Sequence, residues 1–174
     1  MSIVLNGTTG ITAPDIDVTA QTTVATFDAG ITLGGSATTL DDYEEGTWTP
    51  TLEGTTTNPT VTYGARDARY IKVGNIVHVT CAVFLASVAS SGSGDLRMAG
   101  LPFASGDYGS FPLSMAPAEV RNNPTGNFNI AQVNAQGHPT KFIFIDEPDG
   151  TVMQCSNIDG DTAWRFSLTY QVGT

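Results

Sequence analysis

The sequence predicts an all-β protein, and three observations support this class. No long stretch carries apolar residues at the i, i+3, i+4 spacing of an amphipathic helix. Short stretches instead alternate apolar and polar residues, which is the period of a half-buried strand. Turn-forming residues separate these stretches, since the 174 residues include 19 Gly and 9 Pro. Hydrophobic residues make up 40% and charged residues 14% of the chain, which is enough apolar surface for one folded domain.

The clearest strand signal is a hairpin near the middle of the chain. Residues 68–73 and 76–84 are rich in Val, Ile and aromatic residues, and Gly74-Asn75 between them suits a two-residue turn. Further strands are expected over residues 95–99, 111–115, 127–133, 140–146, 151–156 and 164–172. About eight short strands predict a β-sandwich over residues 47–174, with a jelly-roll topology preferred.

The first 40 residues are of a different kind. They contain no Lys or Arg, and their short apolar clusters are separated by turn signals. Fixing a backbone costs about 1–2 kcal/mol per residue, and these clusters are too sparse to offset that cost alone. We expect an extended arm that is ordered by neighbouring chains; the alternative is an extension that wraps its own sandwich. The apolar arm residues expected to dock are Ile3, Val4, Leu5, Ile11, Ile16, Phe27, Ile31 and Leu33.

A joint over residues 40–50, Leu-Asp-Asp-Tyr-Glu-Glu-Gly-Thr-Trp-Thr-Pro, connects the arm to the sandwich. Asp41 is expected to cap a single helical turn that ends at Gly46. Tyr43 and Trp48 are expected to pack this turn against the domain, although aromatic residues among acids can also bind sugar. The arm and joint together span residues 1–46, and the residues assigned to the joint are Asp41, Tyr43, Gly46, Trp48 and Pro50.

The charge balance excludes two classes of partner. The formal net charge is −10, and the seven Lys and Arg residues are scattered along the chain. Nucleic acids and anionic membranes are bound by clustered Lys and Arg, so neither is expected as a partner. No apolar run reaches the roughly 18–20 residues of a membrane helix. The N-terminus lacks the features of a signal peptide, so assembly in a cytoplasm is expected.

The sequence gives no motif for catalysis. It contains no Gly-x-Ser-x-Gly elbow, phosphate-binding loop or dinucleotide-binding turn. His78 falls in the middle of a strand and His138 in a turn, where a hydrogen-bonded or solvated imidazole is expected. The carboxyl groups that could serve a glycosidase cannot be paired from sequence; they include Asp95, Asp107, Glu119 and Asp146. We expect no catalytic residues and no cofactor.

Metal binding and disulfide formation are also not expected. Residues 146–150 and 159–161 place several carboxylates in short loops, which calcium favours, but Asp-Gly is first of all a turn signal. The two Cys and two His residues match no zinc spacing. Cys81 and Cys155 are expected to be buried free thiols, and a disulfide between them is the alternative.

The joint sequence resembles a signature of tail-fibre and other virion structural proteins of tailed bacteriophages. Residues 5–11, 69–77, 92–97 and 100–103 resemble the same family. The resemblance implies a non-enzymatic homotrimer in the virion, assembled in the host cytoplasm. It also implies an N-terminal part that attaches to other virion proteins and a distal β domain.

Two placements in the virion follow from this resemblance. About 40 residues before the joint leave no room for the long shaft of many fibres, which favours a capsid decoration (cement) protein whose arms dock on the coat. The alternative is a short tail or head fibre whose β domain binds host-surface glycans. Its candidate contacts are Tyr108, Asn122, Asn123 and Asn127. A carbohydrate-active enzyme is the least favoured hypothesis.

Overall fold

The computed structural model describes residues 31–32, 39–40, 42–106, 114–122, 128–133, 139–146 and 150–172. These residues form strands and one short 3₁₀ turn, Cys155–Asn157, so the predicted all-β class is confirmed. The strands are β1 Ile31–Thr32, β2 Thr39–Leu40, β3 Tyr43–Thr47, β4 Thr51–Gly54, β5 Thr60–Val73, β6 Ile76–Ser90, β7 Leu96–Ala99, β8 Ser114–Arg121, β9 Phe128–Val133, β10 Lys141–Asp146 and β11 Ala163–Gln171.

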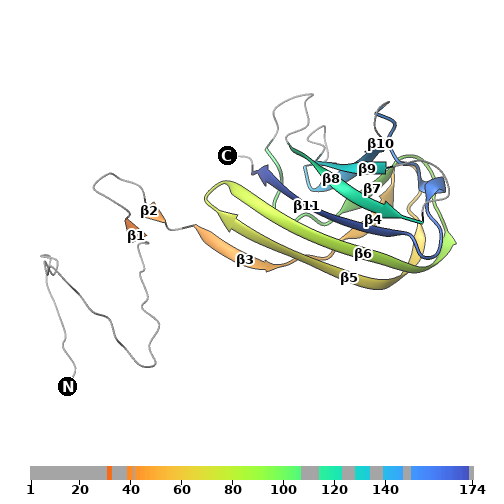
Figure 1. The fold of residues 1–174 in the computed structure, drawn as a ribbon, viewed down its shortest axis with the longest axis horizontal. Coiled ribbons are helices and arrows are strands. Elements are labelled where there is room, and N and C mark those ends of the chain that lie inside the picture. The colour runs from red at the N-terminus through yellow and green to blue at the C-terminus, as the bar shows by residue number, and fades with distance from the viewer. Residues whose placement is uncertain are drawn as a thin grey trace, which may run out of the picture.

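Strands β3 to β11 form one antiparallel sheet in the order β3-β5-β6-β11-β8-β9-β10-β7-β4, and β1 pairs separately with β2. This sheet folds over on itself at β8. Residues 118–121 of β8 pair with β11, whereas residues 114–117 pair with β9. The front layer therefore consists of β3, β5, β6 and β11, and the back layer of β9, β10, β7 and β4 (Figure 1).

The core lies between the two layers and follows from strict alternation along the strands. Strand β11 buries every second residue, and its Trp164 and Tyr170 lie opposite Val83 and Val77 of β6. Phe166 of β11 contacts two rings of β10, with centroid distances of 4.9 Å to Phe142 and 5.8 Å to Phe144; the residues in this cluster are Phe142, Phe144, Trp164 and Phe166. Because β10 and β11 are not neighbours in the sheet, these contacts hold the layers together.

The predicted central hairpin is confirmed. Val73 pairs with Ile76 across the two-residue turn, and Gly74 adopts a φ of +57°, which glycine reaches without steric cost. Both strands are longer than predicted, because β5 begins at Thr60 and β6 continues to Ser90. Irregular pairing between residues 60 and 65 interrupts the alternation there, which explains why the sequence did not indicate this part of β5.

Two local predictions are wrong, and one strand was missed. The joint forms no helical turn: residues 43–47 extend as β3 and pair with residues 69–73 of β5, and this pairing outweighs the local capping signal. Residues 151–156 form no continuous strand, since the Asn157 side chain accepts a hydrogen bond from the Gln154 N–H at 2.5 Å and helps to close the 3₁₀ turn. Strand β4 was not predicted at all.

The strand order does not correspond to the predicted jelly-roll topology. A jelly roll consists of two separate sheets, whereas both layers here belong to one continuous sheet. The jelly-roll topology is therefore not confirmed.

Candidate docking surface

The joint enters the core at Trp48. This side chain is 8% exposed, and its ring lies 5.9 Å from that of Phe142. Its backbone N–H donates to the Ala68 carbonyl at 3.0 Å, which ties the end of β3 to β5. Pro50 is buried as well. Trp48 therefore packs against the domain as predicted.

The other joint residues lie differently. The Tyr43 side chain is 56% exposed, because the alternation along β3 places it beside Val73 on the outer face of the front layer; its predicted packing against the domain is wrong. Gly46 lies against the Tyr70 ring, which a Cβ atom would approach to 2.9 Å, so only glycine fits there without a shift of that ring. Asp41 lies outside the described residues.

Two acidic residues of the joint, Asp42 and Glu44, are bound to neighbouring side chains of β5. The Tyr70 hydroxyl donates to Glu44 Oε1 at 2.6 Å, and this hydrogen bond raises the pKa of Tyr70. Lys72 Nζ forms an ion pair with Asp42 and lies 5.6 Å from the centroid of the Phe103 ring. The edge strand is thereby fixed to its neighbour by side chains as well as by the backbone.

A shallow hollow of about 470 Å³ lies on the front layer beside β3. Its lining comes from three strands: Glu45, Gly46, Thr47, Arg69, Tyr70, Ile71, His78 and Thr80. Both ring nitrogens of His78 have partners, since Nδ1 lies 3.0 Å from Thr169 Oγ1 and Nε2 lies 3.1 Å from Ser167 Oγ. The imidazole is hydrogen-bonded within the chain, as predicted.

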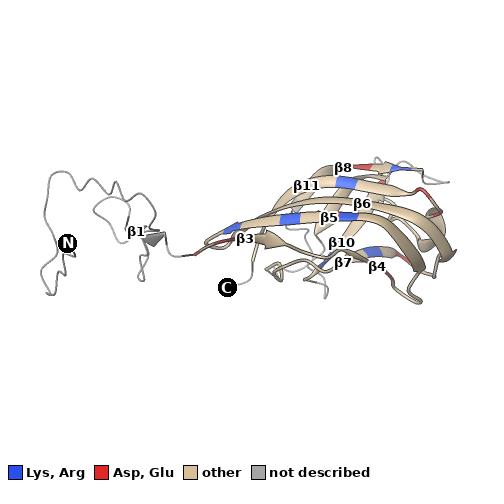
Figure 2. Ribbon diagram, turned by 90° about the horizontal axis from the view of Figure 1, so that it is seen from below, with Lys and Arg blue, Asp and Glu red and all other residues tan. Residues whose placement is uncertain are grey.

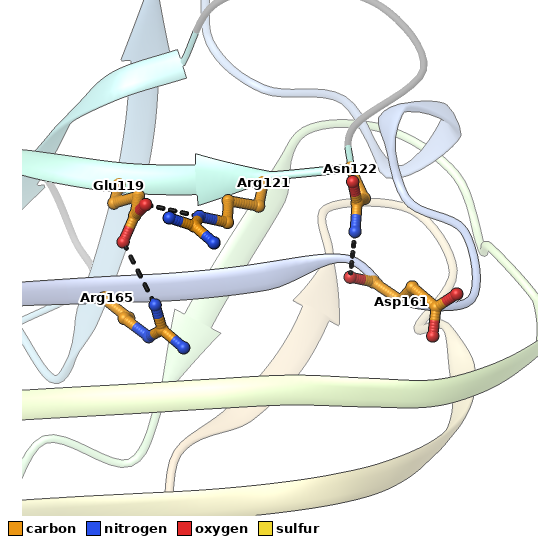
Figure 3. A network of polar contacts seen from close by, with 5 residues as sticks. All are labelled: Glu119, Arg121, Asn122, Asp161 and Arg165. Atoms are coloured by element: carbon orange, nitrogen blue, oxygen red, sulfur yellow. Dashed lines mark hydrogen bonds and ion pairs between the residues drawn. The ribbon is translucent and has the colours of Figure 1, made fainter.

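A second hollow of about 470 Å³ adjoins the first, because Arg69 and Thr80 line both. Glu119 lies on its rim and accepts from Arg121 Nε and from Arg165 Nη1, the latter at 3.4 Å (Figure 3). The hydrogen bond from Arg121 is the main reason that the pKa of Glu119 is lowered. The carboxylate is therefore held ionised between two guanidinium groups.

Of the predicted glycan contacts, the structure describes Asn122. Its side-chain amide donates to the Asp161 carbonyl at 3.2 Å (Figure 3). The Asn122 carbonyl accepts from Thr162 Oγ1 at 2.9 Å. Asn122 and Asp161 both have positive φ values, +53° and +76°. These bonds join the end of β8 to the turn before β11. Tyr108, Asn123 and Asn127 lie outside the described residues.

Lys and Arg residues are spread over strands β5, β7, β8, β10 and β11 rather than gathered in one patch (Figure 2). Among the described residues, no group of three or more His, Cys, Asp or Glu side chains could hold a metal ion. Within the same part of the chain, no helix is long and apolar enough to cross a membrane.

Both cysteines are free and buried, which confirms the prediction. Cys81 Sγ lies 3.7 Å from Met98 Sδ in the opposite layer, and burial raises the pKa of Cys81 to about 12. The thiol therefore belongs to the core.

Of the predicted arm contacts, the structure describes Ile31, which lies in β1 and pairs with Leu40 of β2. The remaining arm residues lie outside the described residues; they are Ile3, Val4, Leu5, Ile11, Ile16, Phe27 and Leu33.

The apolar residues on the outer face of the front layer were not among the site residues predicted from the sequence. Ile71, Val73 and Ile76 are each 44% exposed and lie close to Tyr43. The available signal was the stretch Tyr-Ile-Lys-Val at residues 70–73, which places apolar residues on both faces of one strand.

Comparison with known proteins gives one similarity of fold. No family model matches the chain, and no curated protein matches it. A solved structure, the crystal structure of the Dettilon tailspike protein, matches with a TM-score of 0.59 and 18% sequence identity. The match covers 74% of this chain and 24% of the tailspike, so the chain spans about a quarter of that protein. The two share a fold.

Proposed function

We propose that this chain is a non-enzymatic structural component of a tailed-bacteriophage virion. The observation that carries the proposal is the match of fold to a part of a phage tailspike protein. The joint sequence supports it independently, because it resembles the joint of phage fibre proteins and because Trp48 anchors it in the core. In this proposal residues 1–46 attach to other virion proteins, and the β domain projects from the particle.

The tail is the placement that the fold favours. A tailspike is a tail protein, and the matched fold makes up 24% of one such chain. A short tail fibre or spike module is therefore our first candidate, and its β domain would be free to contact glycans of the host surface. The homotrimer implied by the family resemblance is part of this candidate.

A capsid decoration protein is the second candidate. It is favoured by the N-terminal segment, because residues 1–40 contain no Lys or Arg and carry short apolar clusters. Such a segment suits an arm that lies along a coat, where many weak contacts at repeated sites would add up.

The number of copies in a purified particle separates the two candidates. Quantitative mass spectrometry with a labelled standard should find a few copies for a tail protein and a number close to that of the coat protein for a decoration protein. Immunogold labelling should place the chain at the tail or over the head accordingly. Absence of the chain from purified particles would refute both.

Deletion of residues 1–39 tests the role of the arm. We expect a folded β domain that no longer joins particles, because all the core residues among those that the structure describes lie at or after Trp48. Far-UV circular dichroism and thermal unfolding of the shortened chain provide the control for folding. Retained incorporation into particles would contradict the arm hypothesis.

A further inference from the structure

Large apolar side chains on the surface of the described residues are few, and most of them lie together. Six are exposed: Tyr43, Ile71, Val73, Ile76, Phe84 and Met115. The first four occupy one end of the front layer, and we call them the outer patch. Contiguous exposed apolar surface of this kind marks sites of interaction.

Strand register makes the outer patch continuous. Tyr43 of β3 pairs with Val73 of β5, and Val73 pairs with Ile76 of β6 across the hairpin turn. Ile71 lies two residues before Val73 and thus on the same face of β5. The start of β3 and the turn between β5 and β6 lie at the same end of the layer (Figure 1).

The polar groups beside the outer patch already have partners within the chain. The Tyr43 hydroxyl donates to Glu45 Oε2 at 2.6 Å, which leaves the ring free to contact another surface. His78, next to Ile71, uses both ring nitrogens in contacts with Thr169 and Ser167. Charged groups of a partner would therefore add little binding free energy at the outer patch, and the partner has to offer an apolar surface of its own.

We propose that the outer patch is the contact between copies of this chain. The formal net charge is −10, so two copies repel one another over most of their surface and approach most easily where charged side chains are few. The Glu45 carboxylate lies beside the outer patch, opposite Ile71, and accepts the Tyr43 hydroxyl. A second copy necessarily brings an apolar face of the same size and spacing. Copies arranged around a common axis would bury their outer patches against one another.

The position of the outer patch also suits the proposed function. The inference rests on the homotrimer of that proposal and assigns the surface through which its copies meet. The chain enters the domain at Asp42, directly before Tyr43. If the patches meet near the axis, the N-terminal segments of all copies leave the contact at the same end. Attachment to one place on a particle would then use several arms at once, which raises the avidity without a new contact.

The outer patch alone is smaller than a stable interface. Patches of this kind cover a few hundred Å², whereas each partner in a stable complex buries about 800 Å². The four residues therefore form the centre of the contact, where most of the binding energy is concentrated. Flanking surface on β3 and β6 supplies the remaining area.

Sedimentation velocity of the full-length chain over a wide concentration range tests the proposal. The variant Ile71→Thr/Ile76→Thr removes apolar surface and keeps two β-branched residues in strands that favour them. We expect an oligomer for the wild type and at least about a tenfold higher dissociation constant for the variant, which corresponds to about 1.4 kcal/mol. Met115→Thr is the matched control, because it removes an exposed apolar side chain from β8, far along the sheet, and should leave the dissociation constant unchanged.

Far-UV circular dichroism and thermal unfolding show whether the variant keeps its fold; if it does not, the single variant Ile76→Thr replaces it. An oligomer that dissociates equally in variant and wild type would overturn the assignment of the surface but leave the homotrimer intact. A monomeric wild type would overturn both. Incorporation into particles is measured separately, so that a monomer found in virions would refute the outer patch as a contact between copies and leave the virion role standing.

Discussion

Replacement of Phe142 by alanine tests the description of the core most directly. Phe142 of β10 is fully buried between the two layers. Its ring lies 4.9 Å from Phe166 of the front layer and 5.9 Å from Trp48 of the joint. One side chain thus connects the back layer, the front layer and the chain entry.

The expected loss follows from this burial. A buried Phe→Ala substitution costs about 3–5 kcal/mol, because it removes apolar contacts and leaves a cavity. Domains of ordinary stability unfold with about 5–15 kcal/mol, so Phe142→Ala should remove a large share of the total. In a chain of this size each kcal/mol of lost unfolding free energy lowers Tm by about 2–4 °C, so the expected decrease in Tm is roughly 6–20 °C.

Urea unfolding followed by tryptophan fluorescence measures this loss, since Trp48 and Trp164 both report on the core. Phe142→Leu keeps most of the volume and should cost less than alanine, which preserves a measurable variant if the alanine chain does not fold. Met115→Ala, at an exposed position, should stay within about 0.5 kcal/mol of the wild type. A loss below about 1 kcal/mol for Phe142→Ala would mean that the layers do not pack as described.

Three further predictions concern backbone strain, thiol reactivity and pH. Gly74→Ala should lower the free energy of unfolding by about 1–2 kcal/mol, because the φ of Gly74 is positive but its surroundings are open. Gly100→Ala should lower it by more, because the new Cβ would also lie 2.4 Å from the Thr49 carbonyl oxygen. Equal losses of the two variants in urea unfolding would contradict this. Cys81, with a pKa of about 12, should resist alkylation by iodoacetamide in the native protein at pH 8 and react on unfolding, which mass spectrometry detects. Burial raises the pKa of Tyr170, so the free energy of unfolding should stay constant below pH about 10 and decrease as the pH rises further. Tyr170→Phe should make this decrease with pH smaller. An unchanged slope in the variant would refute the assignment.

Much of the sheet could be predicted from local pattern. The alternation over residues 76–84 and the turn residues Gly74-Asn75 placed the central hairpin, and it forms with the predicted turn. The burial of Cys81 was predicted for the same reason, since Cys81 falls on the apolar face of β6. Period-2 patterning is a property of the strand itself, so it can be read before the partner strands are known.

The joint shows where local pattern was insufficient. The acidic and aromatic residues from Asp41 to Trp48 fit a capped helical turn, yet residues 43–47 gain a full set of ladder partners on β5. This pairing depends on a strand that begins thirteen residues after the joint strand ends, and no local signal contains it. Local sequence pattern therefore could not predict that Tyr43 is exposed or that the outer patch forms.

The sequence by itself determined the all-β class, the central hairpin, and which side of β6 carries the apolar residues. Tertiary structure alone decided that one sheet folds over at β8 and that Phe142 meets Phe166 across the layers. It also decided that Tyr43, Val73 and Ile76 lie side by side on an outer face. The physical reason is range: side-chain alternation is set by adjacent peptide units, whereas strand order and exposed surfaces depend on contacts between distant segments, which form only when the whole chain has folded.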